Sequence, residues 1–302
     1  MGLRWYSGAM FGFLTRGQSI TKIGIDPPVA RPGREGLALV LIVRNEATHI
    51  AEWARFHVLA GVRHFYVYDN GCTDGTIAAL GFLGARLTVI PWDQKFRSGR
   101  LEVHNQVLAY AHATRNFGGA WRWMTYLDAD EFLVPKGAGL DEALAGLAGC
   151  RNISLPWHMY GRSGHVAAPV GGVLANYTRR NPDPMSDAKG LKNFKMIVDP
   201  CHVTALKVHV IETDGRADTC NDMGQPGREV YSAARIQLNH YYTRSDAELQ
   251  AKIARGPNLT TPDADHLRRV MRKVAAIEAG EVEDRSALEF LARMGVPTAA
   301  LL

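Results

Sequence analysis

Three acidic residues, Asp128, Asp130 and Glu131, directly follow an apolar stretch that ends at Leu127. Carboxylates this close repel one another, which raises at least one pKa unless a cation or several hydrogen-bond donors lie among them. Oxygen ligands suit a hard divalent ion such as Mg²⁺ or Mn²⁺, usually shared with the phosphates of a substrate. In an extended chain Asp128 and Asp130 point to the same side, because a single residue separates them. The motif predicts a metal site, and a solvated turn after a strand is the competing interpretation.

The segments around this motif alternate between strand and helix patterns. The continuous apolar run 37–43 predicts a strand covered on both faces, and apolar positions at helical spacing predict a helix over 47–60. This alternation predicts an α/β fold, a Rossmann-like doubly wound and mostly parallel sheet with C-terminal helices. Further strands are predicted at 65–68, 87–90, 123–127, 153–157, 194–198, 205–211 and 234–242, and further helices at 76–83, 101–114, 140–147, 245–255, 262–279 and 285–294.

Polar residues follow three of these strands where each strand ends. In such a sheet, ligands bind outside the carboxyl ends of the strands. We therefore expect one binding site built from these three strand ends. Its candidate residues are Arg44, Asn45 and Glu46 after the first strand, Asp69 and Asn70 after the second, and Asp128, Asp130 and Glu131 after the fourth.

The bulk composition is that of a globular protein. The chain has 302 residues, 46% hydrophobic and 22% charged, with a mild net charge of +5. We expect an N-terminal arm and Pro/Gly linker over 1–36, a catalytic domain over 37–243 and a helical segment over 244–302. Because the basic residues are not gathered in one stretch, nucleic acid is an improbable partner.

The cysteines and the apolar runs bear on the compartment. Cys72, Cys150, Cys201 and Cys220 show no paired C-x-x-C spacing, so we expect reduced thiols in a cytoplasmic protein. The strongly apolar runs are far shorter than the roughly 20 residues of a membrane helix. Basic and aromatic residues in the N-terminal arm would permit peripheral contact with the inner face of a membrane.

The run 69–76, Asp-Asn-Gly-Cys-Thr-Asp-Gly-Thr, resembles a motif of the nucleotide-diphospho-sugar transferases of the GT-A fold, especially glycosyltransferase family 2. That family usually has serine where this chain has Cys72. Taken together and in order, several segments resemble glycosyltransferase family 92 and a family-2-like bacterial group, and the resemblance spans roughly 37–256. These segments are 43–46, 65–70, 128–133, 160–165, 195–198 and 239–245.

The resemblance implies roles for individual residues. Asp69 would contact the nucleotide base beside the Arg44–Asn45 turn, and Asp128 would lie near the ribose and diphosphate. Asp130 would hold Mn²⁺ or Mg²⁺ together with Asp128, and His240 would supply a further metal ligand. A core histidine bonded to the backbone is the alternative interpretation of His240.

We therefore predict a metal-dependent, hexosyltransferase-like enzyme of polysaccharide biosynthesis. It would move a sugar from a UDP- or GDP-sugar to a glycan or lipid-linked acceptor, with inversion implied by the resemblance. The metal would stabilise the charge that develops on the departing phosphate oxygens. One alternative is a binding protein that has kept the donor site without turnover. A nucleotidyltransferase is the second, although residues 44–47 lack the Gly-rich loop that it would need.

An inverting enzyme also needs a base for the acceptor hydroxyl. Relatives tend to carry a glutamate where this chain reads Leu-Ala-Asn-Tyr over 174–177. We select Asp222, because its loop leads into the strand that bears His240. The other acidic candidates are Asp187, Glu212, Asp214 and Asp218, and the aromatic and polar residues that could contact the acceptor are Trp157, Tyr160 and His165.

Overall fold

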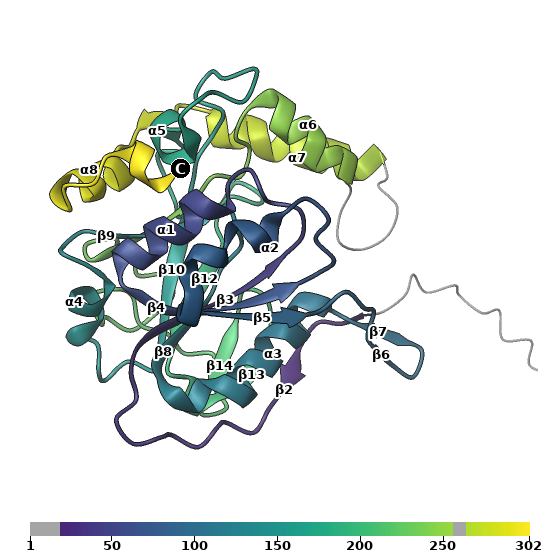
Figure 1. Cartoon of the computed structure of the whole chain (residues 1–302), viewed down its shortest axis with the longest axis vertical. Coiled ribbons are helices and arrows are strands. Elements are labelled where there is room, and N and C mark those ends of the chain that lie inside the picture. The colour runs from purple at the N-terminus through teal and green to yellow at the C-terminus, as the bar shows by residue number, and fades with distance from the viewer. Residues whose placement is uncertain (1–18, 256–263) are drawn as a thin grey trace, which may run out of the picture.

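The computed structural model describes residues 19–255 and 264–302, and its centre is an eight-stranded sheet (Figure 1). Six of these strands run in one direction, and β12 and β9 run in the other. The predicted α/β fold with a mostly parallel sheet is therefore confirmed. In spatial order the strands are β5 (Leu87–Pro91), β4 (Val62–Asp69), β3 (Glu35–Val43), β8 (Trp121–Tyr126), β12 (Phe194–Val198), β10 (Asn152–Met159), β15 (Ile236–His240) and β9 (Glu131–Pro135).

Helices cover both faces of the sheet, which explains the continuous apolar run of β3. Leu39 and Leu41 pack in one hydrophobic cluster with Trp53 of α1 (Ile50–Ala60). Val40 points to the other face and packs in a second cluster with Tyr110 of α3 (Asn105–Phe117). In Figure 1, α1 and α3 lie on opposite sides of β3 and β4. Because β3, β4 and β8 run parallel, their carboxyl ends lie at the same edge of the sheet.

The C-terminal helices pack against the sheet domain and lie together in Figure 1. Arg162, in the loop after β10, pairs with Asp246 and with Glu278, so that it joins two of them. The side chain of Arg55 on α1 donates to the carbonyl oxygens of Leu301 and Leu302. These helices are α5 (Gly172–Asn176), α6 (Asp246–Arg255), α7 (Ala264–Glu278) and α8 (Ser286–Arg293).

Three predicted elements differ from the structure. The helix expected over 76–83 ends early as α2 (Thr76–Ala79), and a 3₁₀ helix follows at Gly81–Arg86, where two glycines weaken helix propensity. The helix expected from 101 begins at 105, after the short strand β7 (Leu101–Val103). The single strand expected over 205–211 is a hairpin of β13 (Val203–Leu206) and β14 (Ile211–Thr213).

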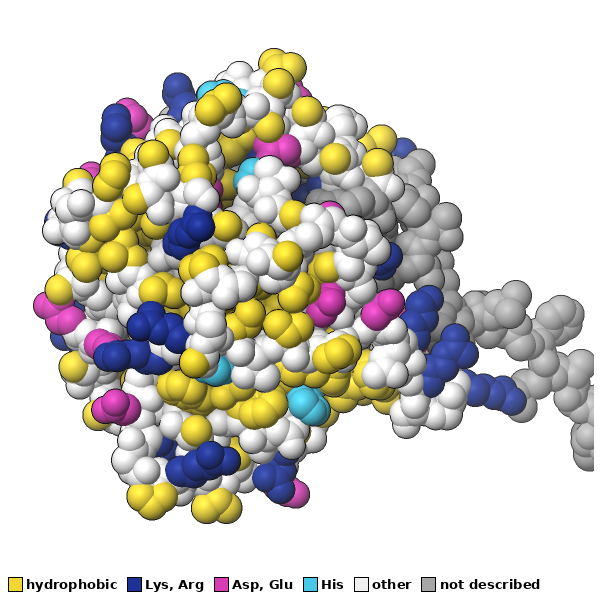
Figure 2. Space-filling view, in the orientation of Figure 1, with side chains coloured by type: hydrophobic (Ala, Val, Ile, Leu, Met, Phe, Trp, Pro, Cys, Tyr) yellow, Lys and Arg dark blue, Asp and Glu magenta, His cyan; other side chains and the backbone are white. Residues whose placement is uncertain are grey.

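The remaining short elements lie at the margins of the sheet. α4 (Leu140–Ala145) follows β9, as predicted from the sequence. Basic side chains on the face shown in Figure 2 are interspersed with acidic and apolar ones, apart from a group over β6 and β7. The short strands are β1 (Ser19–Ile20), β2 (Ile23–Gly24), β6 (Arg97–Ser98), β11 (Arg179–Arg180) and β16 (Val282–Glu283).

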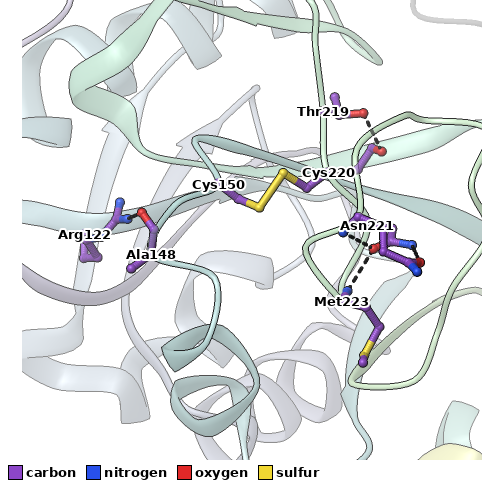
Figure 3. Close-up of a disulfide and its surroundings, with 9 residues drawn as sticks. Arg122, Ala148, Cys150, Thr219, Cys220, Asn221 and Met223 are labelled. Atoms are coloured by element: carbon purple, nitrogen blue, oxygen red, sulfur yellow. Dashed lines mark hydrogen bonds between the residues drawn. A yellow bond between two sulfur atoms is a disulfide. The ribbon is translucent and has the colours of Figure 1, made fainter.

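The expectation of four reduced cysteines is wrong for two of them. Cys150 and Cys220 form a disulfide across 70 residues of sequence, and Cys72 and Cys201 are free (Figure 3). Cys220 is brought to Cys150 because its segment runs beside the start of β10, where the Cys220 amide donates to the Asn152 carbonyl. No spacing rule in the sequence reveals such a long-range pair.

Within residues 19–255 and 264–302, none of the helices combines the length and apolarity needed to cross a membrane. The basic and aromatic residues of the N-terminal arm that suggested peripheral membrane contact fall almost entirely within residues 1–18, outside the described part of the chain.

Candidate functional site

The turns after β3 and β4 are held together by side-chain hydrogen bonds. The Asn45 side-chain oxygen accepts from the Thr73 amide at 2.8 Å, and Asp74 accepts from the Ala47 amide at 3.0 Å. Asn45 has a φ of 55°, a left-handed conformation that asparagine tolerates better than most residues. Two of the three polar strand ends predicted from the sequence therefore form one rigid surface.

The start of α3 connects this surface to the acidic motif. Asn105 donates to the side-chain oxygen of Asn70 at 3.0 Å, and the next residue, Gln106, donates to Asp128 at 2.7 Å. Asp69 closes its own turn, because its carboxylate accepts from the Cys72 amide at 2.8 Å. The structure thus brings all three predicted strand ends together.

Asp128 and Glu131 form an ionic network with a lysine. Lys195, only 1% exposed, lies 3.0 Å from Asp128 and 3.3 Å from Glu131. Burial lowers the pKa of Lys195, but the two carboxylates outweigh burial and hold it well above its ordinary value. Glu131 also accepts from the Trp157 indole at 2.7 Å and from the Asp128 amide at 2.8 Å. The network fixes the turn between β8 and β9.

Asp130 lies next to a different lysine and a histidine. One of its oxygens is 2.9 Å from Nζ of Lys252 on α6, and the other is 3.4 Å from Nε2 of His240. Burial would raise the pKa of Asp130, yet Lys252 and His240 outweigh it and hold that pKa well below its ordinary value. Asp130 is therefore a carboxylate at neutral pH, and its negative charge is compensated.

A cleft of about 310 Å³ opens beside Asp130. Across it, Arg244 lies 3.3 Å from Glu46, and His49 lies 2.6 Å from Glu248. Its wall thus combines the turn after β3, the acidic motif and helix α6. The residues that line this cleft include Asn45, Glu46, His49, Asp130, Tyr242, Arg244, Glu248 and Lys252.

Two lysines from different helices converge on Tyr242. Nζ of Lys252 lies 4.4 Å from the centre of the Tyr242 ring, and Nζ of Lys273 on α7 lies 3.9 Å from it. Lys273 is also 5.0 Å from the Trp157 ring. Burial, followed by the charge of Lys252, lowers the pKa of Lys273 to about 8. This side of the site is rich in positive charge.

The three predicted metal ligands do not form a ligand set together. Asp130 and His240 face each other, but both oxygens of Asp128 are bonded, to Gln106 and to Lys195. Across the described residues, no three His, Cys, Asp or Glu side chains are grouped so that they could hold an ion. An ion on Asp130 would also lie close to the ammonium of Lys252 and be repelled by it. The side chains as arranged do not fit a divalent ion.

Asp222, the base selected from the sequence, lies at the opposite end of β15 from His240. Its carboxylate is fully buried and accepts from the backbone amides of Arg235 and Ile236 at 2.7 and 3.0 Å. The other four acidic candidates are also absent from the cleft lining. Asp222 therefore anchors the start of β15, far from the cleft.

The predicted acceptor residues are placed differently from one another. Tyr160 is 1% exposed and packs on Tyr241, so it belongs to the core. The ring of Trp157 lies 4.4 Å from that of His240 and is also buried. His165 is partly buried and lies 3.2 Å from the Asn176 carbonyl. Arg44 is exposed beside Asn45. None of these four lines the cleft.

Sequence reasoning missed several residues that build the site. Lys195 stands in one of the segments that carried the family resemblance, so a signal for it existed. Lys252 and Lys273 lie on helices that were predicted from the sequence, but no local pattern marked either lysine as a site residue. Gln106 carries no sequence signal at all, because its role comes only from where α3 starts.

Residues 41–274 match the family model described as glycosyltransferase family 92. A glycosyltransferase family 92 protein of Ricinus communis is 25% identical over 195 residues, which cover 60% of this chain and 32% of that protein. A glycosyltransferase family 92 protein of Oryza sativa subsp. japonica is 26% identical over 184 residues, which cover 58% of this chain and 29% of that protein. The chain thus spans about a third of the length of these curated relatives.

Among solved structures, S. aureus TarS 1-349 in complex with UDP-GlcNAc is similar with a TM-score of 0.39 and 12% identity, over 85% of this chain and 72% of that chain. A second similar structure is glucosyl-3-phosphoglycerate synthase from Mycobacterium tuberculosis in complex with Mn²⁺, UDP and glucosyl-3-phosphoglycerate. Its TM-score is 0.28 and its identity 17%, over 56% of this chain and 57% of that chain.

Proposed function

Because this chain belongs to glycosyltransferase family 92, we propose that it transfers a sugar from a nucleotide-diphospho-sugar to the hydroxyl group of a glycan or lipid-linked acceptor. The donor would be a UDP- or GDP-sugar. One observation carries the proposal: the polar ends of β3, β4 and β8 meet at one edge, beside a cleft lined by Asp130. Ligands of α/β sheets bind at this edge.

The proposed donor site follows from the rigid turns. Asn45 and Glu46 line the cleft, and Asp69 and Asn70 stand in the turn after β4 that is bonded to theirs. We place the nucleoside on this surface and the diphosphate toward Asp130, where the cations gather. Prior fixing of the polar groups reduces the entropy lost when the donor binds.

The proposed transfer is a substitution at the anomeric carbon with inversion. The acceptor oxygen forms a bond to that carbon and gives up its proton, which passes to solvent, and the bond from the carbon to the phosphate oxygen breaks. The nucleoside diphosphate leaves with the electron pair, so negative charge increases on its oxygens. Cations close to those oxygens favour the transition state over the bound donor. Lys252 lines the cleft, and its ammonium is the positive charge that we assign to these oxygens.

A protein that binds the donor without turning it over would use the same cleft. The presence of the acceptor-activating base distinguishes the two functions, and Asp222 lies away from the cleft. Release of nucleoside diphosphate, measured beside donor binding, therefore separates the two functions.

Thermal unfolding with a panel of nucleotide-sugars tests donor binding. A ligand that binds only the native state stabilises it by about 2.7 kcal/mol at a concentration 100 times its dissociation constant. We expect one nucleotide class to raise the Tm of the wild type and of Asp187→Ala. Asp187 is a matched control, because its side chain is 93% exposed and pairs with Lys192 away from the cleft. The same donors should leave the Tm of Asp130→Ala unchanged, and equal shifts in all three proteins would refute the proposed site.

A further inference from the structure

The charges around Asp130 are balanced without a metal ion. Lys252 lies 2.9 Å from one carboxylate oxygen, and its ammonium also donates to the Tyr242 carbonyl at 3.1 Å. An ammonium has three N–H donors, so one remains for another acceptor. The side chain of Lys252 is 40% exposed and lines the cleft. It can therefore contact an anion in the cleft while it stays on Asp130.

Lys273 adds a second positive charge nearby. Within the described residues its ammonium makes no ion pair or hydrogen bond, and its contacts are the faces of the Tyr242 and Trp157 rings. Cation–π contacts compensate only part of the cost of removing an ammonium from water. A second cation on Tyr242 increases that cost, since like charges repel. An anion bound in the cleft would relieve the repulsion.

We propose that the ammonium groups of Lys252 on α6 and Lys273 on α7 neutralise the donor diphosphate in place of a divalent ion. This inference rests on the proposed function. Lys252 contacts the phosphate oxygens directly, and Lys273, which lies against the Tyr242 ring and does not line the cleft, contributes its charge without direct contact. Asp130, Lys252 and Lys273 together carry one net positive charge, which offsets part of the two negative charges of a nucleotide-sugar diphosphate. The extra charge on the departing nucleoside diphosphate strengthens both interactions as the bond breaks.

The arrangement also explains why the predicted metal ligands are apart. Lys195 forms an ion pair with Asp128, and Lys252 forms an ion pair with Asp130. A divalent ion bound to Asp130 would stand next to the ammonium of Lys252, and this repulsion is strong in a partly buried site. Asp130 can therefore pair with Lys252 or bind a divalent ion, but not both. The distance of 2.9 Å between Lys252 and Asp130 favours the pair with lysine.

Calorimetric titration with UDP and with GDP, in EDTA and again in Mn²⁺, tests the inference. We expect the wild type to bind one of them in EDTA with an affinity that Mn²⁺ leaves unchanged. Lys252→Met should weaken binding about 10- to 100-fold, the range for loss of a charged hydrogen bond. Lys273→Met should weaken it by a smaller factor, because its contact is indirect. Lys252→Arg keeps the charge and should retain binding. Lys207→Met is the control, because Lys207 is exposed on the turn between β13 and β14.

Each outcome decides between the two proposals. Binding by the wild type only in Mn²⁺ would overturn the inference and leave the proposed function standing. Binding in EDTA that Lys252→Met and Lys273→Met leave unchanged would do the same. No binding of UDP, GDP or their sugars in either buffer would remove the proposed function, and the inference with it. Thermal melts of each ligand-free variant show whether it is folded.

Discussion

Asp130 and Asp222 are two buried aspartates with opposite surroundings. Asp130 faces a lysine, a histidine and a cleft, whereas Asp222 accepts from two backbone amides at the start of β15. The sequence shows the same residue type in both places. What separates a binding carboxylate from a structural one is the kind of donor around it, which depends on the fold.

Substituting each aspartate with asparagine tests this difference. Asp222→Asn should lower the free energy of unfolding by about 1–3 kcal/mol, because a charged hydrogen-bond acceptor is lost in the core. Its folded fraction should keep the donor affinity of the wild type. Asp130→Asn should instead weaken donor binding, because the ammonium of Lys252 loses the carboxylate that holds it at the cleft. Urea unfolding and calorimetry measure the two effects, and loss of turnover in folded Asp222→Asn would restore Asp222 as the base.

At the scale of single elements, helix α6 is held in place by one carboxylate. Glu248 accepts from the Tyr177 hydroxyl at 2.7 Å and the Ser245 hydroxyl at 2.6 Å, and it pairs with His49 at the start of α1. Burial raises the pKa of Glu248, but His49, Ser245 and Tyr177 outweigh burial and hold it well below the ordinary value of 4.5. The position of Lys252, one turn further along α6, depends on these contacts.

The contribution of Glu248 to stability should therefore depend on pH. A carboxylate whose pKa is depressed by folding stabilises the protein fully above its unfolded pKa, near 4.5, and this stabilisation is lost as the pH falls further. Relative to Glu248→Gln, the wild type should be more stable at pH 7, by about 1–3 kcal/mol. That advantage should shrink below about pH 4.5. Urea unfolding from pH 3 to 7 measures it, and a constant difference would contradict the assigned contacts.

Local sequence patterns were sufficient to predict most elements and the three polar strand ends. Apolar runs and helical spacing are short-range signals, so β3, β4, β8 and α1 were located from them. Lys252 contacts Asp130 across 122 residues of sequence, and no local pattern carries such information. The hairpin over 203–213 was missed because its turn over 207–210 contains no glycine, proline, asparagine or aspartate to mark it.

For the whole molecule, the disulfide is the feature that the sequence most clearly misled us about. Cys150 precedes β10, and Cys220 lies in the long segment before β15 (Figure 3). The bond closes a loop of 70 residues and so restricts the unfolded chain. A disulfide that restricts the unfolded chain in this way raises the free energy of unfolding of a small domain by about 2–5 kcal/mol.

Thiol counting and unfolding test the disulfide. The denatured protein, purified without reductant, should react at two thiols, those of Cys72 and Cys201, and at four after reduction. Cys150→Ser should lower the free energy of unfolding by about 2–5 kcal/mol, the usual cost of removing a native disulfide. Cys201→Ser is the control and should change it by much less. Four reactive thiols before reduction would show that the bond does not form.

The transfer of a sugar from a nucleotide-sugar is tested most directly by turnover. Release of nucleoside diphosphate would be measured for the wild type and Asp130→Ala with a panel of UDP- and GDP-sugars, with water and with simple glycans as acceptors. We predict release with one nucleotide class by the wild type, at a rate well above that of Asp130→Ala. Donor binding without any release would identify a binding protein. Equal rates in both proteins for every donor would contradict the assignment of this cleft as the site of glycosyl transfer.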